Sequence, residues 1–294
     1  TTEIYTLSLH DALPIFLIQA CELRKLAGDP AGQAWSTMYL GMIDFMQGNF
    51  SEAGHSHAHA LEMARQRHDV LQTAIHLTNL GRVSLSLGKY DQAVAQFDES
   101  LNLKRRVGDR TGQGFSLFNL GLAYLDLGRL EEAEQMLSDS LALRQQINDE
   151  RGVGYCWWGL GLLAQSRQQH VEAEAALQQA FEIHTRLGLR PEVLNDLSAL
   201  AETALALRRS DDAQQLAGQA MQQTAVLEKS QSAAGVYLML ARVYAGQPSG
   251  VEFAQRAYEL VMQQAARISS LEDRHIFLSA VRINREVLAL RSQP

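Results

Sequence analysis

A period of forty residues runs through most of this 294-residue chain and limits its possible folds more than any other feature. A Leu-Gly or Leu-Ala pair recurs at this step, at residues 40–41, 80–81, 120–121, 160–161, 200–201 and 240–241. A glycine lies eight residues after each of the first three leucines, at Gly48, Gly88 and Gly128. Long strict periods are typical of solenoids and propellers, in which each unit packs on the next.

The spacing inside each unit is helical. Alanines recur at residues 53, 93, 133, 173 and 213, and an apolar residue follows four positions later at Phe97, Leu137 and Leu177. The units lack the paired short β-branched runs that a propeller blade needs. We therefore predict an all-α chain, which agrees with its abundant leucine, alanine and glutamine and its five prolines.

Capping signals divide each unit into two helices. In the third unit Asp109 is the expected N-cap of a helix that ends near residue 127, and Gly128 closes the turn. A second helix is expected over about 130–147. Asp149 repeats this capping position in the fourth unit, and Asp29, followed by proline, repeats it in the first.

Small residues explain how the two helices pair. Gly121 lies in mid-helix, where glycine costs about 1 kcal/mol relative to alanine. Gly121 and Ala133 allow the two backbones to approach closely, which offsets that cost. We predict that this small-residue contact makes each unit a helical hairpin.

The units resemble the tetratricopeptide repeat (TPR), in its forty-residue subclass. The string Leu120-Gly121-x-x-Tyr124, followed by Ala133 and Leu137, matches the family signature. The resemblance implies an α-α superhelix of about six helix-turn-helix repeats, at 29–68, 69–108, 109–148, 149–188, 189–228 and 229–268, preceded by a remnant second helix at 16–28. Departures lie toward the C-terminus: alanine replaces glycine at 201 and 241, Gln168 and Arg208 stand at turn positions, and the segment 246–250 inserts one residue.

The last segment, 269–294, is expected to form a C-terminal capping helix. Ser269 and Glu272 fit a capping box, and apolar residues at 277, 278, 281, 287 and 288 could cover the last repeat. The string over 277–290 also resembles the tail of TPR regions that close bacterial signalling ATPases and cyclase-like regulators.

The first fifteen residues read as a non-native segment. Residues 1–15 match, codon for codon, the translation of a standard sequencing-library adapter. They also break the repeat register, because Ser8 stands at the turn-glycine position and Pro14 would lie inside a helix. We therefore expect that the natural chain extends upstream of Phe16.

Composition excludes several classes of partner. Lys and Arg number 26 against 33 Asp and Glu, which gives a net charge of −7 and no basic stripe for nucleic acid. No apolar run is long enough to span a membrane. Two cysteines cannot make a disulfide framework, so we predict a reducing, cytoplasmic location.

The first helices carry a second apolar stripe beyond the one their own hairpin needs. Its members are Trp35, Met38, Met42 and Phe45 in the first unit, Phe115, Phe118, Leu122 and Leu125 in the third, and Tyr155, Trp158 and Leu162 in the fourth. The stripe either lines a concave groove that binds a peptide or packs neighbouring first helices together. We expect Trp158 and Phe118 to be its most exposed members.

Polar residues stand beside this stripe. Asn79 and Asn119 occupy equivalent positions, and in peptide-binding TPR proteins an asparagine on this helix often clamps the ligand backbone. The alternative is that these asparagines only solvate the groove. Arg82 could meet a carboxylate of the ligand, and Asp126 could meet a basic group.

No catalytic, metal or cofactor site is predicted. Nucleophile-elbow, phosphate-loop and zinc-protease motifs are missing from the sequence, and Cys156 is expected to be a packed thiol. His55 and His59 share a helix face, which suggests zinc. However, His57 aligns with the core positions of later repeats, so a solvated face with one buried imidazole is the better interpretation.

We therefore predict a non-enzymatic scaffold or sensor that binds a peptide or a partner domain in its groove. The resemblance implies the C-terminal part of a larger bacterial signal-transduction or transcription-regulatory protein, and an upstream domain of the same chain is a second candidate partner. Two alternatives stay open: a self-contained TPR adaptor, and the non-catalytic tail of an enzyme whose catalytic domain lies upstream.

Overall fold

The computed structural model describes residues 16, 19–20, 22–24, 26–28, 30–223 and 232–291, and the regular structure among them is α-helical. The segment 1–15, interpreted as an adapter translation, lies outside the described residues, as does Asp29, the expected first N-cap. Within 16–28 the described residues are helical as far as Leu26 and end in a turn at Gly28.

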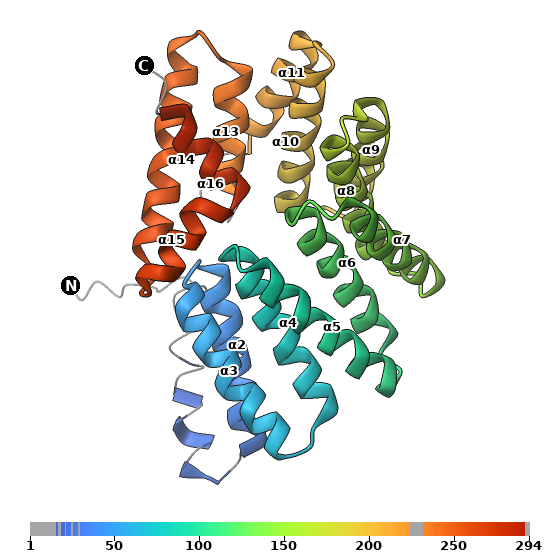
Figure 1. Ribbon diagram of the computed structural model, residues 1–294, viewed down its shortest axis with the longest axis vertical. Coiled ribbons are helices and arrows are strands. Elements are labelled where there is room, and N and C mark those ends of the chain that lie inside the picture. The colour runs from blue at the N-terminus through green and yellow to red at the C-terminus, as the bar shows by residue number, and fades with distance from the viewer. Residues whose placement is uncertain are drawn as a thin grey trace, which may run out of the picture.

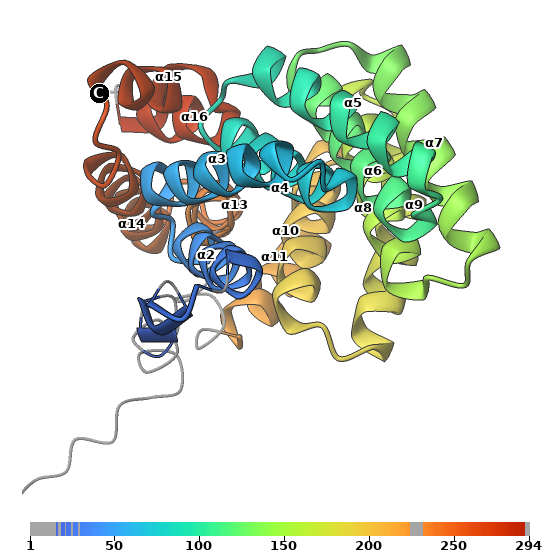
Figure 2. The same cartoon turned by 90° about the horizontal axis from the view of Figure 1, so that it is seen from below.

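The repeats form six consecutive helix pairs. The pairs are α2 (Pro30–Met46) with α3 (Phe50–Gln66), α4 (Val70–Ser86) with α5 (Tyr90–Val107), α6 (Arg110–Asp126) with α7 (Leu130–Gln146), α8 (Glu150–Ser166) with α9 (His170–Arg186), α10 (Arg190–Ala206) with α11 (Ser210–Met221), and α13 (Ala233–Val243) with α14 (Pro248–Ala266). Each second helix also packs on the first helix of the next pair. Figure 1 and Figure 2 show these pairs following one another around a superhelical turn, with the first helices toward the inside. The predicted all-α superhelix is confirmed.

The helix boundaries follow the capping residues. Asp69, Asp109 and Asp149 each accept a hydrogen bond from the backbone N–H three residues later. Such a cap satisfies one of the N–H groups that the first turn leaves unpaired. Gly48 and Gly128 end the first helices of their pairs with φ angles of 78° and 73°, a left-handed conformation that favours glycine.

Each mid-helix glycine makes room for a core side chain of the second helix. A Cβ atom on Gly121 would lie 2.6 Å from Leu137 Cγ, and a Cβ on Gly81 would lie 2.5 Å from the Phe97 ring. In the fifth pair alanine replaces the mid-helix glycine, at Ala201. The residue at the position of Leu137 is correspondingly small, Ala217, and both lie in one buried cluster. The two helices therefore approach closely, as predicted. The closest contact of Gly121 is the side chain of Leu137, four residues beyond Ala133.

Four turns among the described residues keep the left-handed conformation without glycine: His68 and Asn148 lie between repeats, and Gln168 and Arg208 lie between the two helices of a repeat. Gln168 and Arg208 have φ angles of 60° and 59°. For a residue with a Cβ atom this conformation costs roughly 1–2 kcal/mol.

We therefore expect Arg208→Gly to stabilise the protein by about 0.5–1 kcal/mol, since part of the strain relief is offset by the entropy of glycine in the unfolded chain. Thermal unfolding followed by circular dichroism measures the effect. Gly128→Ala is the matched control: a Cβ there meets nothing within 4 Å, so it should only add strain and lower the melting temperature. A lower melting temperature for Arg208→Gly would contradict the prediction.

Three successive repeats have a buried basic side chain near the C-terminal end of their second helix. These residues are Lys104 of α5, Arg144 of α7 and His184 of α9, forty residues apart. Positive charge is favourable near a helix C-terminus. Lys104 Nζ donates to Thr78 Oγ1 at 2.7 Å and to Ser116 Oγ at 3.0 Å, so it joins two neighbouring repeats. Burial lowers the pKa of Lys104 to about 8.

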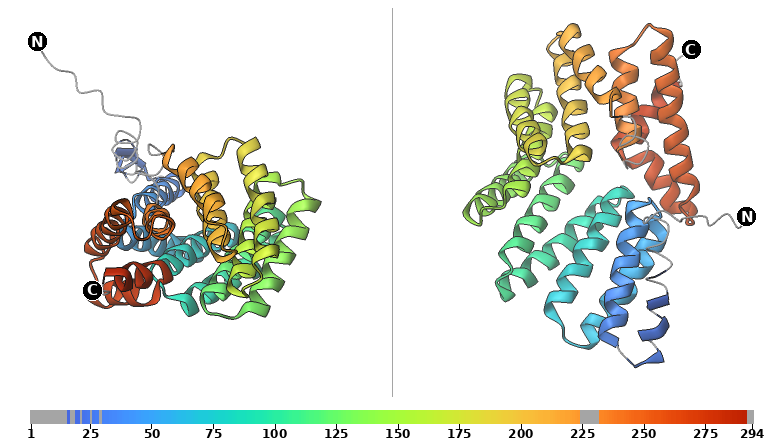
Figure 3. Two further views of the ribbon diagram at one scale, coloured as in Figure 1. Left: turned by 90° about the horizontal axis from the view of Figure 1, so that it is seen from above. Right: turned by 180° about the vertical axis from the view of Figure 1, so that it is seen from behind.

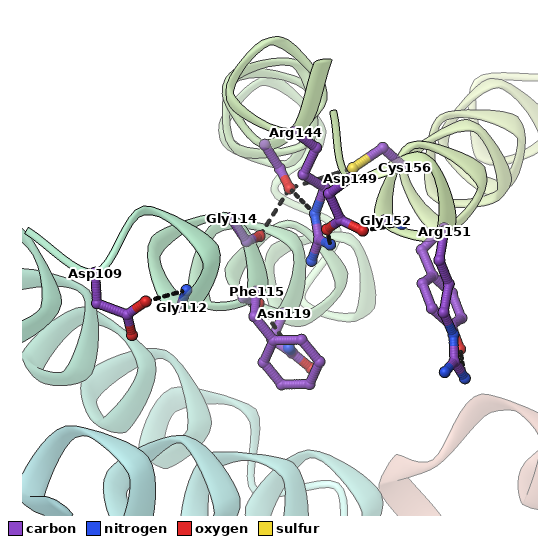
Figure 4. Close-up of polar contacts among 12 residues, drawn as sticks. Asp109, Gly112, Gly114, Phe115, Asn119, Arg144, Asp149, Arg151, Gly152 and Cys156 are labelled. Carbon is purple, nitrogen blue, oxygen red and sulfur yellow. Dashed lines mark hydrogen bonds and ion pairs between the residues drawn. The ribbon is translucent and has the colours of Figure 1, made fainter. Parts of the chain in front are cut away.

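The next two boundaries repeat this arrangement with other partners. Arg144 donates to Ser140 Oγ and to the carboxylate of Asp149, the N-cap of α8 (Figure 4). His184 Nδ1 lies 2.7 Å from Asp196 Oδ2 on α10. A layer of buried polar contacts therefore joins the second to the fifth repeats.

The C-terminal cap differs from the expected single helix. It consists of α15 (Leu271–Ala280) and α16 (Arg282–Arg291), separated by Val281 in an extended conformation. Ser270 caps α15 by accepting a hydrogen bond from the Asp273 backbone N–H, so the expected capping box of Ser269 and Glu272 is wrong by one residue. The Asn284 amide donates to the Phe277 carbonyl in the last turn of α15. Phe277 of α15 and Val287 of α16 enter the same buried cluster.

This cluster closes the superhelix on itself. It joins Phe45, Phe50 and Val83 of the first two pairs to Phe277 and Val287 of the cap, together with residues of α13 and α14. Figure 3 shows α14, α15 and α16 beside α2 and α3 from two directions. The first and last repeats are therefore neighbours in space.

Polar contacts surround the apolar centre of this closure. Lys89 Nζ lies 2.6 Å from Asp273 Oδ1, and Arg267 Nη1 donates to the Gln47 carbonyl at 2.6 Å. The Tyr90 hydroxyl donates to the Ala280 carbonyl at 3.2 Å. The closure thus combines an apolar core with a polar rim, as a protein–protein interface does.

Candidate functional site

The predicted second stripe divides into exposed and buried residues. Trp35 is 48% exposed and stacks on Tyr39 of the same helix, with 5.9 Å between ring centroids. Phe115 is 37% exposed on α6. Figure 4 shows Phe115 and Asn119 of α6 and Arg151 of α8 pointing to the same side, away from Arg144 of α7. Part of the stripe therefore remains available on the inner face.

Other members of the stripe are packed. The expectation that Trp158 and Phe118 are its most exposed members is wrong, because Trp158 is half-buried and Trp35 and Phe115 are more exposed. Phe118 is only 8% exposed, and Met38 is also buried. A Cβ atom on Gly159 of α8 would lie 3.3 Å from the Phe118 ring, so the missing side chain of the next repeat makes space for the phenyl group. At this position the stripe packs neighbouring first helices.

The two equivalent asparagines have different surroundings. Asn119 is buried, and its amide donates to the Phe115 carbonyl of the same helix at 2.7 Å. Asn79 is half-buried, and its side chain makes no hydrogen bond to the described residues. Of the two, Asn79 keeps its amide available for a ligand.

The charged residues predicted for the groove contact other parts of the chain. The Arg82 guanidinium stacks on Phe45 with its carbon 4.3 Å from the ring centroid, and it lies 6.0 Å from the centroid of Phe115. Asp126 lies within electrostatic reach of Arg282 and Arg285 of the cap. The basic groups that act on Asp126 therefore belong to α16.

Tyr155 and Trp158 help to line a pocket between four helices. The pocket has a volume of about 110 Å³. Its lining residues are Phe118 of α6, Tyr155 and Trp158 of α8, His184 of α9, and Glu192, Asn195 and Asp196 of α10. Aromatic rings form one side, since Phe118 and Tyr155 are 5.8 Å apart and Tyr155 and His184 are 5.4 Å apart between centroids.

A polar network closes the edge of this pocket. Glu192 accepts hydrogen bonds from the Tyr155 hydroxyl and from Arg151 Nη2, the latter at 2.9 Å. Burial and the hydrogen bond to Glu192 raise the pKa of Tyr155 to about 12, so its hydroxyl stays protonated at neutral pH. The network orders Tyr155 and fixes α8 against α10.

Three residues that line this pocket also carry buried polar atoms without partners. Asp196 and His184 are almost completely buried. Asp196 Oδ1, His184 Nε2 and Trp158 Nε1 find no hydrogen-bond partner among the described residues. Burial raises the pKa of Asp196, against the opposing effect of His184. Unsatisfied buried groups are few in folded proteins, so three on residues around one pocket are unusual.

The histidine and cysteine predictions have clear structural outcomes. His57 is buried and its ring centroid lies 5.7 Å from that of His76, whereas His55 and His59 are exposed, so the three do not converge on one point. The part of the chain that the structure describes contains no cluster of three or more His, Cys, Asp or Glu side chains arranged to hold a metal ion. Cys156 is buried with its Sγ 3.2 Å from Ser140 Oγ, as expected of a packed thiol.

None of the described helices combines the length and apolar character that crossing a bilayer requires.

Sequence reasoning missed the α10 side of the pocket. Asp196 stands at the same repeat position as Cys156, Ser116 and His76, all of which are buried. A carboxylate at a position that holds histidine, serine or cysteine in the earlier repeats was the available signal. Glu192 and Asn195 precede Asp196 by one helical turn and by one residue. Neither residue shows a comparable signal in the sequence.

Comparisons with known proteins agree with this architecture. A family model described as tetratricopeptide repeat matches residues 31–106, 72–146 and 155–225. No curated protein sequence matches the chain significantly. Among solved structures, the Rap conjugation gene regulator of the plasmid pLS20 in complex with the Phr* peptide is similar with a TM-score of 0.69 at 11% identity, covering 99% of this chain and 80% of that one.

Two further structures are similar. A Rap protein complexed with competence and sporulation factor has a TM-score of 0.66 at 15% identity and covers 99% of this chain and 89% of that chain. BtubC from P. vanneervenii has a TM-score of 0.60 at 18% identity and covers 75% of this chain and 93% of that chain. At these identities the likeness concerns the fold alone.

Proposed function

The chain belongs to the tetratricopeptide-repeat family, and from this premise we propose that the inner face of its superhelix binds a peptide or an extended segment of a partner protein. The single observation that carries the proposal is the aromatic pocket on that face, in which Tyr155 and Trp158 adjoin buried polar atoms without partners. Aromatic anchors beside a few fixed polar groups are typical of protein–peptide recognition.

The related folds support a peptide as ligand. The two Rap structures contain the Phr* peptide and competence and sporulation factor, respectively. The proposal includes the role of a scaffold or sensor in a larger bacterial signalling or transcription-regulatory protein located in the cytoplasm, with an upstream domain of the same chain as a second partner. The resemblance of the segment 277–290 to the tails of such regulators supports this part.

Peptide display on the full chain tests the proposal. We expect the selected peptides to bind Phe115→Ala and Trp158→Ala at least about tenfold more weakly, because truncating a buried aromatic anchor costs 2 kcal/mol or more. Fluorescence anisotropy of labelled peptides measures the affinities. Val171→Ala, which truncates a 66% exposed residue on α9, is the control and should bind like the unmodified protein. Equal affinities for all the variants would remove the inner face as the site.

A further inference from the structure

The closure of the superhelix contains a second pocket, which shares no lining residue with the pocket between α6, α8, α9 and α10. Residues of α3, α4 and α5 line it, together with residues at the start of α15. We propose that this pocket binds a tyrosine side chain of a partner protein, in addition to the ligand of the inner face.

The pocket has an apolar side. Its volume is about 210 Å³, and its apolar lining consists of Phe50 of α3 and Leu80, Val83 and Leu87 of α4. Leu80 is only half-buried, whereas Leu120, its equivalent in the next repeat, is 2% exposed. The pocket therefore leaves part of an apolar side chain uncovered.

Gly54 on α3 leaves this space open. Val94 stands at the equivalent position of the next repeat, where it packs against the buried cluster that contains Leu120. A Cβ atom on Gly54 would meet only Val83 Cγ1, at an ordinary contact distance of 3.6 Å, so the packing does not require glycine here. Close approach of a ligand to the backbone is another role of glycine, and Gly54 lines the pocket.

The size of the pocket suits one aromatic side chain. An apolar cavity of about 150 Å³ is large enough to bind benzene. At about 210 Å³ this pocket has room for a phenol ring and its methylene group. Leu80, Val83 and Leu87 supply apolar contacts for the ring.

Neutral polar groups line another part of the pocket and suit a hydroxyl group. Gln96 accepts a hydrogen bond from Ser84 Oγ at 2.8 Å, which leaves its NH₂ group accessible and without a partner among the described residues. Gln92 is exposed, and its side chain makes no hydrogen bond within the described part of the chain. A phenol hydroxyl both donates and accepts, so it can bond to either amide.

The charges at the pocket favour a neutral ligand. Lys89 Nζ lies 2.6 Å from Asp273 Oδ1, so these two charged lining residues are already paired. A charged ligand would compete with this pair, whereas a tyrosine leaves it intact. Because Asp273 belongs to α15, a side chain in the pocket contacts the first two helix pairs and the cap together.

Nuclear magnetic resonance of the full chain with p-cresol, the side chain of tyrosine, tests this inference. We expect p-cresol to shift the methyl signals of Leu80, Val83 and Leu87, with a dissociation constant on the order of 1 mM for so small a ligand. Toluene lacks the hydroxyl and should bind roughly threefold to tenfold more weakly. Methyl signals that stay unmoved, or toluene that binds as tightly as p-cresol, would overturn the inference.

Filling the pocket gives a matched pair of variants. Gly54→Val introduces the residue of the next repeat and should bind p-cresol at least about tenfold more weakly, because its methyl groups occupy the space of the ring. Gly54→Ala adds only a Cβ atom and should bind p-cresol nearly as well as the unmodified protein. Both variants should melt at a higher temperature, since glycine is the weakest helix former apart from proline, so that lost binding does not reflect unfolding. Unchanged binding by Gly54→Val would place p-cresol elsewhere and refute the site.

Peptide display on the full chain extends the test to a protein ligand. Selected peptides that p-cresol displaces should carry tyrosine at one fixed position and should bind Gly54→Val weakly. Displaced peptides with another residue at that position would overturn the choice of tyrosine. A selection from which p-cresol displaces nothing would overturn the docking of a partner at this pocket, while the proposed function of the inner face would stand.

Discussion

Lowering the pH from about 7 to about 5 is expected to destabilise this protein by roughly 4 kcal/mol through His57 and His76 alone. Both imidazoles are buried, and His57 Nδ1 and both nitrogens of His76 have no partner among the described residues. Burial, reinforced for His57 by the neighbouring His76, lowers the pKa of His57 to about 3, and burial lowers that of His76 to about 4.

The direction follows from where the protons bind. The ordinary pKa of histidine is 6.5, so below that pH the unfolded chain takes up protons that the folded chain excludes. Stability is therefore lost as the pH falls from 6.5 toward the folded pKa values. At about pH 5 each histidine lies 1.5 pH units below its unfolded pKa, which corresponds to about 2 kcal/mol per residue.

Substitution separates these histidines from the other titrating groups. His57→Leu places at this repeat position the residue found in the third and fourth repeats, Leu137 and Leu177. It should remove about half of the expected loss at pH 5. Urea unfolding followed by circular dichroism at both pH values measures the free energies. His59→Gln changes an exposed histidine two residues away and should leave the pH dependence as it is. An unmodified protein equally stable at pH 5 and pH 7 would contradict the assignment.

The second large effect is expected at the closure of the superhelix. Phe277→Ala should destabilise the docked cap by about 3–5 kcal/mol, the usual cost of truncating a buried phenylalanine. Phe277 is 5% exposed, and its ring centroid lies 6.4 Å from that of Phe50 in the first repeat. Without this ring, the remaining Lys89–Asp273 ion pair is partly exposed and contributes little.

Solution scattering distinguishes opening of the ring from simple loss of stability. We expect a larger radius of gyration for Phe277→Ala, because the first and last repeats separate while each stays helical. Leu271→Ala, in the same helix but 77% exposed, should change neither the radius nor the stability. A destabilised variant whose radius stays unchanged would show that the cap holds only α13 and α14 and not the first repeats.

The repeat pattern predicted the local structure correctly, because the relevant interactions lie within a few turns of the chain. Asp109 caps the helix that follows it, Gly128 ends that helix, and Leu137 is fully buried against Gly121. Each of these contacts lies within a single helical hairpin, so spacing along the sequence is enough to infer it.

The candidate site was only half predictable. Tyr155 and Trp158 follow from the apolar stripe, but Phe118 is buried because the next repeat has Gly159 opposite its ring. Asp196 enters the pocket from another repeat, paired with a histidine of the preceding helix. Such contacts depend on the side chains of the neighbouring repeat and on the angle between the two repeats. Neither can be inferred from the pattern of a single repeat.

The hairpins, their caps and the order in which they stack can be inferred from the amino-acid pattern. The meeting of the first repeat with the cap, with Phe50 against Phe277, and the pocket between α8 and α10 become visible in the folded molecule. The physical reason is geometric: each repeat adds a small rotation to the one before it. The sum of these rotations, and not the pattern of any one repeat, brings residues more than two hundred positions apart into contact.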